Sequence, residues 1–128
     1  MTKESAQADD RRQSNSASVI YHNPRCSTSR NALALLRDKG VEPKVVEYLK
    51  TPPTRGQLAD MIHDAGIPVR EAVRKREAPY AELGLDGATD DELLDAMAAN
   101  PILIQRPFVV TPKGTRLARP VDVLHEIL

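Results

Sequence analysis

Residues 18–48 read SVIYHNPRCSTSRNALALLRDKGVEPKVVEY, and their pattern of apolar and turn residues indicates the class of fold. Short β-branched runs open and close this stretch, at 18–21 and 45–48, and such runs are typical of buried strands. The segment between them has apolar residues at helical spacing and ends at Lys39 and Gly40, a cation and a glycine suited to a helix C-terminus. Strand, helix and strand predict a βαβ unit, with parallel strands and a right-handed crossover.

The next block, residues 54–100, is predicted to be largely helical. Capping-box spacing occurs at 54–57 and again at 89–92, each time ahead of an apolar run with helical period. Pro68 is expected to start another short helical stretch that continues to the basic cluster 74–76. The block is too short to hold a core of its own, so we expect an insertion and not a second domain.

The C-terminal part changes to two short predicted strands, at 108–110 and 116–118. The sequence between them, 112–115, has hairpin chemistry. Pro120 is suited to the first turn of a closing helix, whose apolar residues share one face. A βαβ unit, a helical insertion and a ββα unit together predict an α/β protein with a thioredoxin-like fold.

The composition limits the possible classes of protein. The 128 residues suit one domain, which we place at 18–128, behind a polar and aperiodic leader at 1–17 that we expect to be disordered. The 18 basic and 18 acidic side chains give zero net charge, which argues against binding to nucleic acid or to a membrane surface. Apolar runs are too short to span a bilayer and no secretory signal is evident, so a cytoplasmic protein is expected.

Cys26 is the only cysteine and the strongest candidate for a reactive group. It lies in a loop leading directly into the predicted helix, where free backbone N–H groups and the helix dipole favour the thiolate. His22 would lower the thiol pKa further if it is protonated or donates a hydrogen bond, and Arg25 and Arg30 add positive charge. An inert buried cysteine is the alternative, but the polar flanking residues favour a reactive thiol.

Residue counting excludes two familiar uses of such a cysteine. A low-molecular-weight phosphatase loop needs arginine at the sixth position after the cysteine, where this chain has Ala32. A dithiol oxidoreductase needs Cys-x-x-Cys, and Ser29 occupies the position of the second cysteine. Any redox cycle at Cys26 must therefore use an external thiol.

A series of ordered motifs covers about residues 18–128. They are YHNPxCxTSRN at 21–31, YLxxPP at 48–53, RxxxR at 70–74, PYxxLGL at 79–85, PILIxRP at 101–107 and VVTPxGTRLxRP at 109–120. Together they resemble the glutaredoxin-coupled bacterial arsenate reductases, which have a thioredoxin-like fold with a helical insertion. Arg25 is a departure, since a small residue often stands beside the cysteine in that family.

The resemblance implies an enzyme of arsenic detoxification that reduces arsenate to arsenite. The cysteine matching Cys26 attacks arsenate and forms a thiol–arsenic(V) adduct, which glutathione attacks and glutaredoxin resolves. His22 matches the histidine that helps to keep the thiol ionised, and Ser29 matches the family's active-site serine. The resemblance implies no bound cofactor, with glutathione as co-substrate, and arsenate, glutathione and glutaredoxin as partners.

The family's three oxyanion-binding arginines match Arg74, Arg106 and Arg119. A thiolate attacking an anionic arsenate needs permanent positive charge beside it, and the planar guanidinium fits a tetrahedral oxyanion. On its own, Arg74 looks like part of a solvated basic face, whereas Arg106 and Arg119 each precede a proline that favours extended backbone. The resemblance implies a cis peptide between Arg106 and Pro107 that directs Arg106 at Cys26.

Two other functions remain open at this stage. One is a related monothiol protein that acts on another oxyanion or on a glutathione mixed disulfide. The other, a redox regulator that binds RNA polymerase, typically uses Cys-x-x-Cys, which Ser29 removes. His63 and His125 have no zinc-ligand spacing with Cys26, so no metal site is expected.

Overall fold

Four strands form one sheet in the order β3-β2-β4-β5 in the computed structural model, which describes residues 17–128. The strands are β2 (Val19–His22), β3 (Lys44–Glu47), β4 (Phe108–Thr111) and β5 (Gly114–Leu117). β2 and β3 are parallel and place His22 opposite Glu47. β4 runs antiparallel to both β2 and β5. The predicted βαβ unit and C-terminal hairpin are confirmed.

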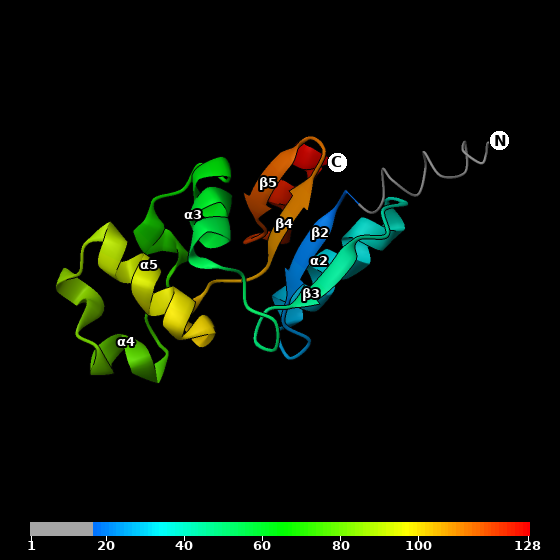
Figure 1. Cartoon of the computed structure of the whole chain (residues 1–128). Helices are drawn as coiled ribbons and strands as arrows, with labels where there is room; N and C mark the ends of the chain where they lie inside the picture. The colour runs from blue at the N-terminus through cyan, green and yellow to red at the C-terminus, as the bar shows by residue number, and fades with distance from the viewer. Residues whose placement is uncertain (1–16) are drawn as a thin grey trace.

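Helices cover both faces of this sheet (Figure 1). The α-helices are α2 (Ser27–Asp38), α3 (Arg55–Asp64), α4 (Ala78–Glu82) and α5 (Asp90–Ala99). The 3₁₀ segments are η1 (Val69–Ala72), η2 (Leu85–Gly87), η3 (Pro101–Leu103) and η4 (Val121–Ile127). In Figure 1 the helices α3, α4 and α5 gather at one side of the sheet, and α2 lies behind it. The fold is therefore thioredoxin-like, with the predicted helical insertion between β3 and β4.

Two apolar clusters hold these layers together. Side chains on the central strand β4 alternate between the faces of the sheet, so that Phe108 and Val109, both fully buried, enter different clusters. Val109 packs with Ile20 and with Leu36 of α2. Phe108 packs with the insertion, through residues such as Leu58 of α3. The insertion thus shares its core with the sheet and is not a separate domain.

Both predicted capping boxes begin helices of the insertion. The side chain of Thr54 accepts from the backbone N–H of Gln57, whose side chain accepts from the N–H of Thr54. Thr89 and Glu92 form the same reciprocal pair at α5. These bonds satisfy N–H groups that a helix start otherwise leaves free, and they fix where α3 and α5 begin.

The helical stretch predicted from Pro68 to the basic cluster is wrong beyond residue 72. Only η1 forms, and Val73 then pairs with Ile104 in an isolated antiparallel bridge. The N–H of Arg74 donates to the carbonyl of Leu103 at 2.7 Å. Pairing of residues 73–74 with residues 103–104 thus replaces local helical hydrogen bonds. This pairing places Arg74 beside Gln105 and Arg106.

The closing helix has the predicted place but not the predicted type, because Val121–Ile127 is a 3₁₀ segment. Its Leu124 and Ile127 are buried against the sheet, as the apolar pattern indicates. The leader predicted at 1–17 lies outside the described residues except for Ala17. Within the described part of the chain, no helix combines the length and the apolar character needed to cross a membrane.

Candidate active site

Cys26 occupies the position before the first turn of α2, at the end of the short loop that follows β2. It is the N-cap residue, with extended φ and ψ of −97° and 122°. Its N–H donates to the carbonyl of Asn23 at 3.0 Å, and its carbonyl accepts from the N–H of Arg30 at 3.0 Å. The side chain is only 8% exposed. The loop therefore fixes the backbone and leaves the sulfur at the positive end of the helix.

The surroundings of the sulfur favour its negative charge. Burial is the largest single cause and raises the pKa of Cys26. The backbone N–H groups of Ser29 and Thr28 and the side chain of Arg106 together lower it by more, so the net pKa lies below its ordinary value. The Cys26 side chain makes no capping hydrogen bond at the start of α2. Cys26 is thus prepared to react as a thiolate.

His22 and Ser29 contact each other beneath the loop. Nδ1 of His22 lies 2.6 Å from the Ser29 hydroxyl oxygen, which also accepts the backbone N–H of Asn23 at 3.0 Å. Burial is the main cause that lowers the pKa of His22; Arg37 and Arg30 lower it further, whereas Glu47 raises it. His22 is therefore neutral at neutral pH, and it supports the loop through Ser29.

The exposed arginines of the loop have backbone roles. The N–H of Arg25 donates to Oδ1 of Asn23 at 2.9 Å, and the guanidinium of Arg30 donates to the carbonyl of Pro24 at 2.9 Å. The charge that lowers the pKa of Cys26 belongs instead to Arg106. The sequence led us to expect positive charge at the thiol from Arg25 and Arg30. The structure shows that this charge comes from Arg106, on a segment far along the sequence.

Arg106 lies in the segment that precedes β4, and its charge lowers the pKa of Cys26. Its peptide bond to Pro107 is cis, as the resemblance implied. The side chain lines a cavity of about 430 Å³, together with His22, Asn23 and Tyr48. Its Nε is buried and has no hydrogen-bond partner among residues 17–128. A buried N–H donor without a partner, next to a thiolate, is suited to an anionic ligand.

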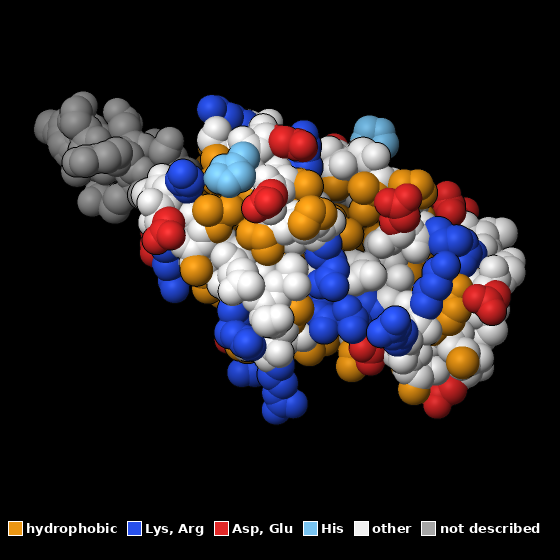
Figure 2. All heavy atoms as spheres, turned by 180° about the vertical axis from the view of Figure 1, so that it is seen from behind, with side chains coloured by type: hydrophobic (Ala, Val, Ile, Leu, Met, Phe, Trp, Pro, Cys, Tyr) orange, Lys and Arg blue, Asp and Glu red, His pale blue; other side chains and the backbone are white. Residues whose placement is uncertain are grey.

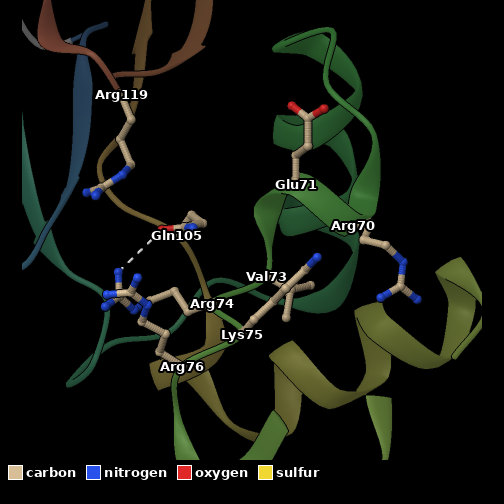
Figure 3. A pocket seen from close by; sticks show the side chains of 8 residues that line it. All are labelled: Arg70, Glu71, Val73, Arg74, Lys75, Arg76, Gln105 and Arg119. Atoms are coloured by element: carbon tan, nitrogen blue, oxygen red, sulfur yellow. Dashed lines mark hydrogen bonds between the residues drawn. The ribbon is translucent and has the colours of Figure 1, made fainter. Parts of the chain in front are cut away.

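Arg74 lies beside this cavity in an ion pair. Its Nε donates to Glu77 at 3.1 Å and its Nη1 donates to the Gln105 side chain at 3.3 Å (Figure 3). The two charged side chains are 18% and 26% exposed. Glu77 lines the cavity that contains Arg106, whereas Arg74 lines a second cavity. The ion pair therefore stands at the boundary between the two cavities.

Arg119 extends from the end of β5 toward the same place. It is exposed, and its Nη1 donates to the backbone carbonyl of Arg106 at 3.1 Å. It lines the second cavity, of about 550 Å³, with Arg74, Gln105 and Arg76 (Figure 3). Seen from behind the view of Figure 1, the molecule shows basic side chains gathered near the middle of its surface (Figure 2). The three arginines thus meet around two neighbouring cavities, with Arg106 nearest to Cys26.

Arg70 lines the second cavity too, but its guanidinium points away from Arg119 (Figure 3). It donates to the hydroxyl of Tyr80 at 3.1 Å, to the carbonyl of Leu85 at 3.3 Å and to the carbonyl of Ala88 at 2.7 Å. These bonds connect η1 with α4 and η2. The first arginine of the RxxxR motif is therefore a structural tie within the insertion.

Sequence reasoning did not identify Tyr48, Glu77 and Gln105 as residues of the site. Tyr48 was available from the pattern, because it directly follows β3 and the carboxyl ends of parallel strands meet at one edge of a sheet. Gln105 depends on the bridge between Val73 and Ile104, which no local pattern indicates, whereas Glu77 is three residues from Arg74 and within local reach of it. Within residues 17–128, no three His, Cys, Asp or Glu side chains gather closely enough to hold a metal ion.

Known proteins share both the sequence and the fold. A family model described as "ArsC family" matches residues 21–127. The arsenate reductases of Rhizobium meliloti (strain 1021) and Escherichia coli (strain K12) are 60% and 58% identical to the chain over 112 residues, which are 86% of this chain and 80% and 79% of those proteins. The structure of the arsenate reductase from Vibrio cholerae superposes with a TM-score of 0.82 at 44% identity, covering 87% of this chain and 97% of that chain. The chain described here therefore belongs to the ArsC family.

Proposed function

We propose that this chain is an arsenate reductase, which reduces arsenate to arsenite through a thiol–arsenic(V) adduct on Cys26. The observation that supports the proposal is a cysteine at the N-cap of α2 whose pKa is lowered by Arg106, an arginine with a buried and unpartnered Nε–H. The names of the related proteins agree with this substrate. A thiolate and an arsenate repel each other, so the site needs fixed positive charge where they meet.

Arg106 is the first group that supplies this charge. Its unpartnered Nε–H offers a hydrogen bond to an arsenate oxygen, while its charge already lowers the pKa of the thiol. Arg74 and Arg119 lie next to it and would hold the remaining oxygens. Guanidinium groups keep their charge at all relevant pH values and bind oxyanions through paired N–H groups. We assign substrate binding to Arg74, Arg106 and Arg119.

The reductant comes from outside the chain in this proposal. Reduction of arsenate to arsenite takes two electrons, and two thiols supply them when they join in a disulfide. Cys26 is the only thiol in the sequence and Ser29 replaces the second one. Glutathione would therefore attack the adduct, and glutaredoxin would resolve the product and release arsenite. The cytoplasm, where glutathione keeps thiols reduced, suits this cycle.

A steady-state assay tests the substrate and both reductants together. Arsenite is measured with arsenate, glutathione and glutaredoxin all present, and again with each one omitted. We expect turnover only in the complete mixture. A glutathione mixed disulfide of a small thiol, offered in place of arsenate, controls for the related redox activity. Turnover of that disulfide without arsenite formation from arsenate would contradict the proposal.

A further inference from the structure

We propose that Tyr48 is a further catalytic residue, whose hydroxyl donates a hydrogen bond and then a proton to the oxygen that leaves arsenic when Cys26 attacks. The inference rests on the proposed arsenate reduction. It concerns a residue that no motif argument placed in the site, and it follows from where the sheet and the cavity bring that side chain.

The parallel pair of strands delivers Tyr48 to the cavity. β2 and β3 are in register with His22 opposite Glu47, so Asn23 and Tyr48 are the next residues along the two strands. Tyr48 is 2% exposed and belongs to the core cluster that the insertion shares with the sheet. It also lines the cavity of about 430 Å³ that contains Arg106. A phenol fixed in the core therefore borders the cavity that Arg106, His22 and the loop before Cys26 also line.

The hydrogen bonds of Asn23 leave the phenol proton available. Oδ1 of Asn23 accepts from the N–H of Arg25 at 2.9 Å, so its amide NH₂ group faces other partners. The Asn23 side chain lowers the pKa of Tyr48, as an amide N–H donor beside the phenol oxygen would. The Tyr48 hydrogen is then free to point toward an oxygen of a ligand in the cavity.

Neighbouring charges suit this residue to hold and then release a proton. Burial is the largest cause and raises the pKa of Tyr48, and the nearby Cys26 raises it further. Asn23, Arg106 and Arg74 lower it by less, so the net pKa is above its ordinary value. Tyr48 is therefore protonated at neutral pH and is a donor before the reaction. Arg106 and Arg74 would stabilise a transient phenolate once the proton has moved.

The step balances without a further reactant. The thiolate of Cys26 forms an S–As bond to dihydrogen arsenate, and one As–OH bond breaks with its electron pair on oxygen. The Tyr48 proton converts that departing hydroxide to water, and the phenolate later takes a proton from solvent. Arsenic remains As(V), and the reduction follows in the thiol steps. Proton donation to a leaving group typically contributes about 10²–10⁴-fold in rate.

The variant Tyr48→Phe tests the proposal, because it removes one oxygen atom and keeps the ring in the core. Tyr80→Phe is the matched control: Tyr80 is also a buried phenol of the same cluster, but its hydroxyl bonds to Asp86 and Arg70. The measurements are the single-turnover rate of arsenite formation at saturating arsenate, glutathione and glutaredoxin, and KM for arsenate from steady-state kinetics. We expect Tyr48→Phe to lower the rate by about 100-fold with little change in KM. Tyr80→Phe should change neither, because its hydroxyl lies outside the cavity that Arg106 lines.

A second readout separates proton donation from support of the loop. The pH profile of Cys26 alkylation by iodoacetamide should be the same in Tyr48→Phe and the wild type, because the phenol acts on the leaving oxygen. A rate within twofold of the wild type overturns the role of Tyr48, and so does a lower rate accompanied by a displaced alkylation profile. If the wild type forms no arsenite, the proposed function itself fails, which is a different and recognisable result.

Discussion

Nδ1 of His22 lies 2.6 Å from the hydroxyl oxygen of Ser29, at the position where a dithiol enzyme carries its second cysteine. Both side chains are buried, and the same oxygen accepts the N–H of Asn23. Ser29 stands where a Cys-x-x-Cys enzyme has the cysteine that closes its disulfide. In this chain its hydroxyl instead holds the loop before Cys26. Because burial lowers the pKa of His22, the charge that favours the thiolate comes from Arg106 and the start of α2 and not from a protonated imidazole.

Replacing Ser29 should therefore affect stability. Ser29→Ala leaves the N–H of Asn23 and Nδ1 of His22 without their buried partner, which costs about 1–3 kcal/mol. Urea unfolding followed by circular dichroism measures the loss. Ser27→Ala is the matched control, since Ser27 is exposed in the same turn of α2, and we expect a change within about 0.5 kcal/mol. Equal effects of the two variants would argue against the anchoring role of Ser29.

The reactivity of Cys26 should extend to lower pH than that of a free thiol. A pKa below the ordinary value means that, at every pH below that value, a larger fraction of Cys26 is thiolate than in the unfolded chain. The rate of alkylation by iodoacetamide, measured against pH in the native and the urea-unfolded protein, checks this shift. In Arg106→Met the native profile should move back to higher pH. An unchanged profile in that variant would refute the contribution of Arg106.

Arg106 should not be replaceable by lysine. An ammonium group keeps the positive charge but lacks the Nε–H and the planar fork that face the cavity. We expect Arg106→Lys to lower kcat/KM for arsenate by about 10–100-fold. Arg55→Lys serves as control, because Arg55 forms exposed ion pairs with Asp91 and Asp95 on the insertion. Steady-state kinetics on both variants decide the point, and full activity of Arg106→Lys would contradict it.

Arg70 should matter for stability, although it lines the same cavity as Arg74. Arg70→Met removes the donors to Tyr80, Leu85 and Ala88 and should cost about 2–3 kcal/mol. Lys75→Met, on the exposed rim of that cavity, should change stability by no more than about 0.5 kcal/mol. Denaturant melts of the two variants compare them directly. A small effect of Arg70→Met would remove its role as a tie.

Much of the fold could be predicted from local sequence patterns. The βαβ unit follows from two short β-branched runs around an amphipathic helix, and the capping boxes at Thr54 and Thr89 mark the starts of α3 and α5. These features depend on residues a few positions apart. The path of the chain after η1 does not, because Val73 pairs with Ile104, which lies far along the sequence. Local periodicity therefore wrongly predicted a helix there.

Residues of the candidate site also differ in whether local sequence spacing predicts their positions. Cys26, Ser29 and His22 are close in sequence, so motif spacing predicts that they meet. The place of Tyr48 depends on strand register, and the pairing of Arg74 with Gln105 depends on the bridge between Val73 and Ile104. The neutral state of His22 depends on burial, which sequence spacing does not reveal. Contacts between distant segments thus determine the positions of Tyr48 and Arg74, and burial determines the charge state of His22.

In the proposed reaction the thiolate of Cys26 is the nucleophile that attacks arsenate. Arsenite formation by Cys26→Ser and by the wild-type protein, with arsenate, glutathione and glutaredoxin supplied, measures whether this thiolate is required. Serine is similar in size and suits the N-cap position, but it is not ionised at neutral pH. We therefore expect the fold to be intact, and a thermal melt of both proteins verifies this. The predicted result is arsenite formation by the wild type and none above background by Cys26→Ser. Undiminished turnover by the folded variant would contradict the account.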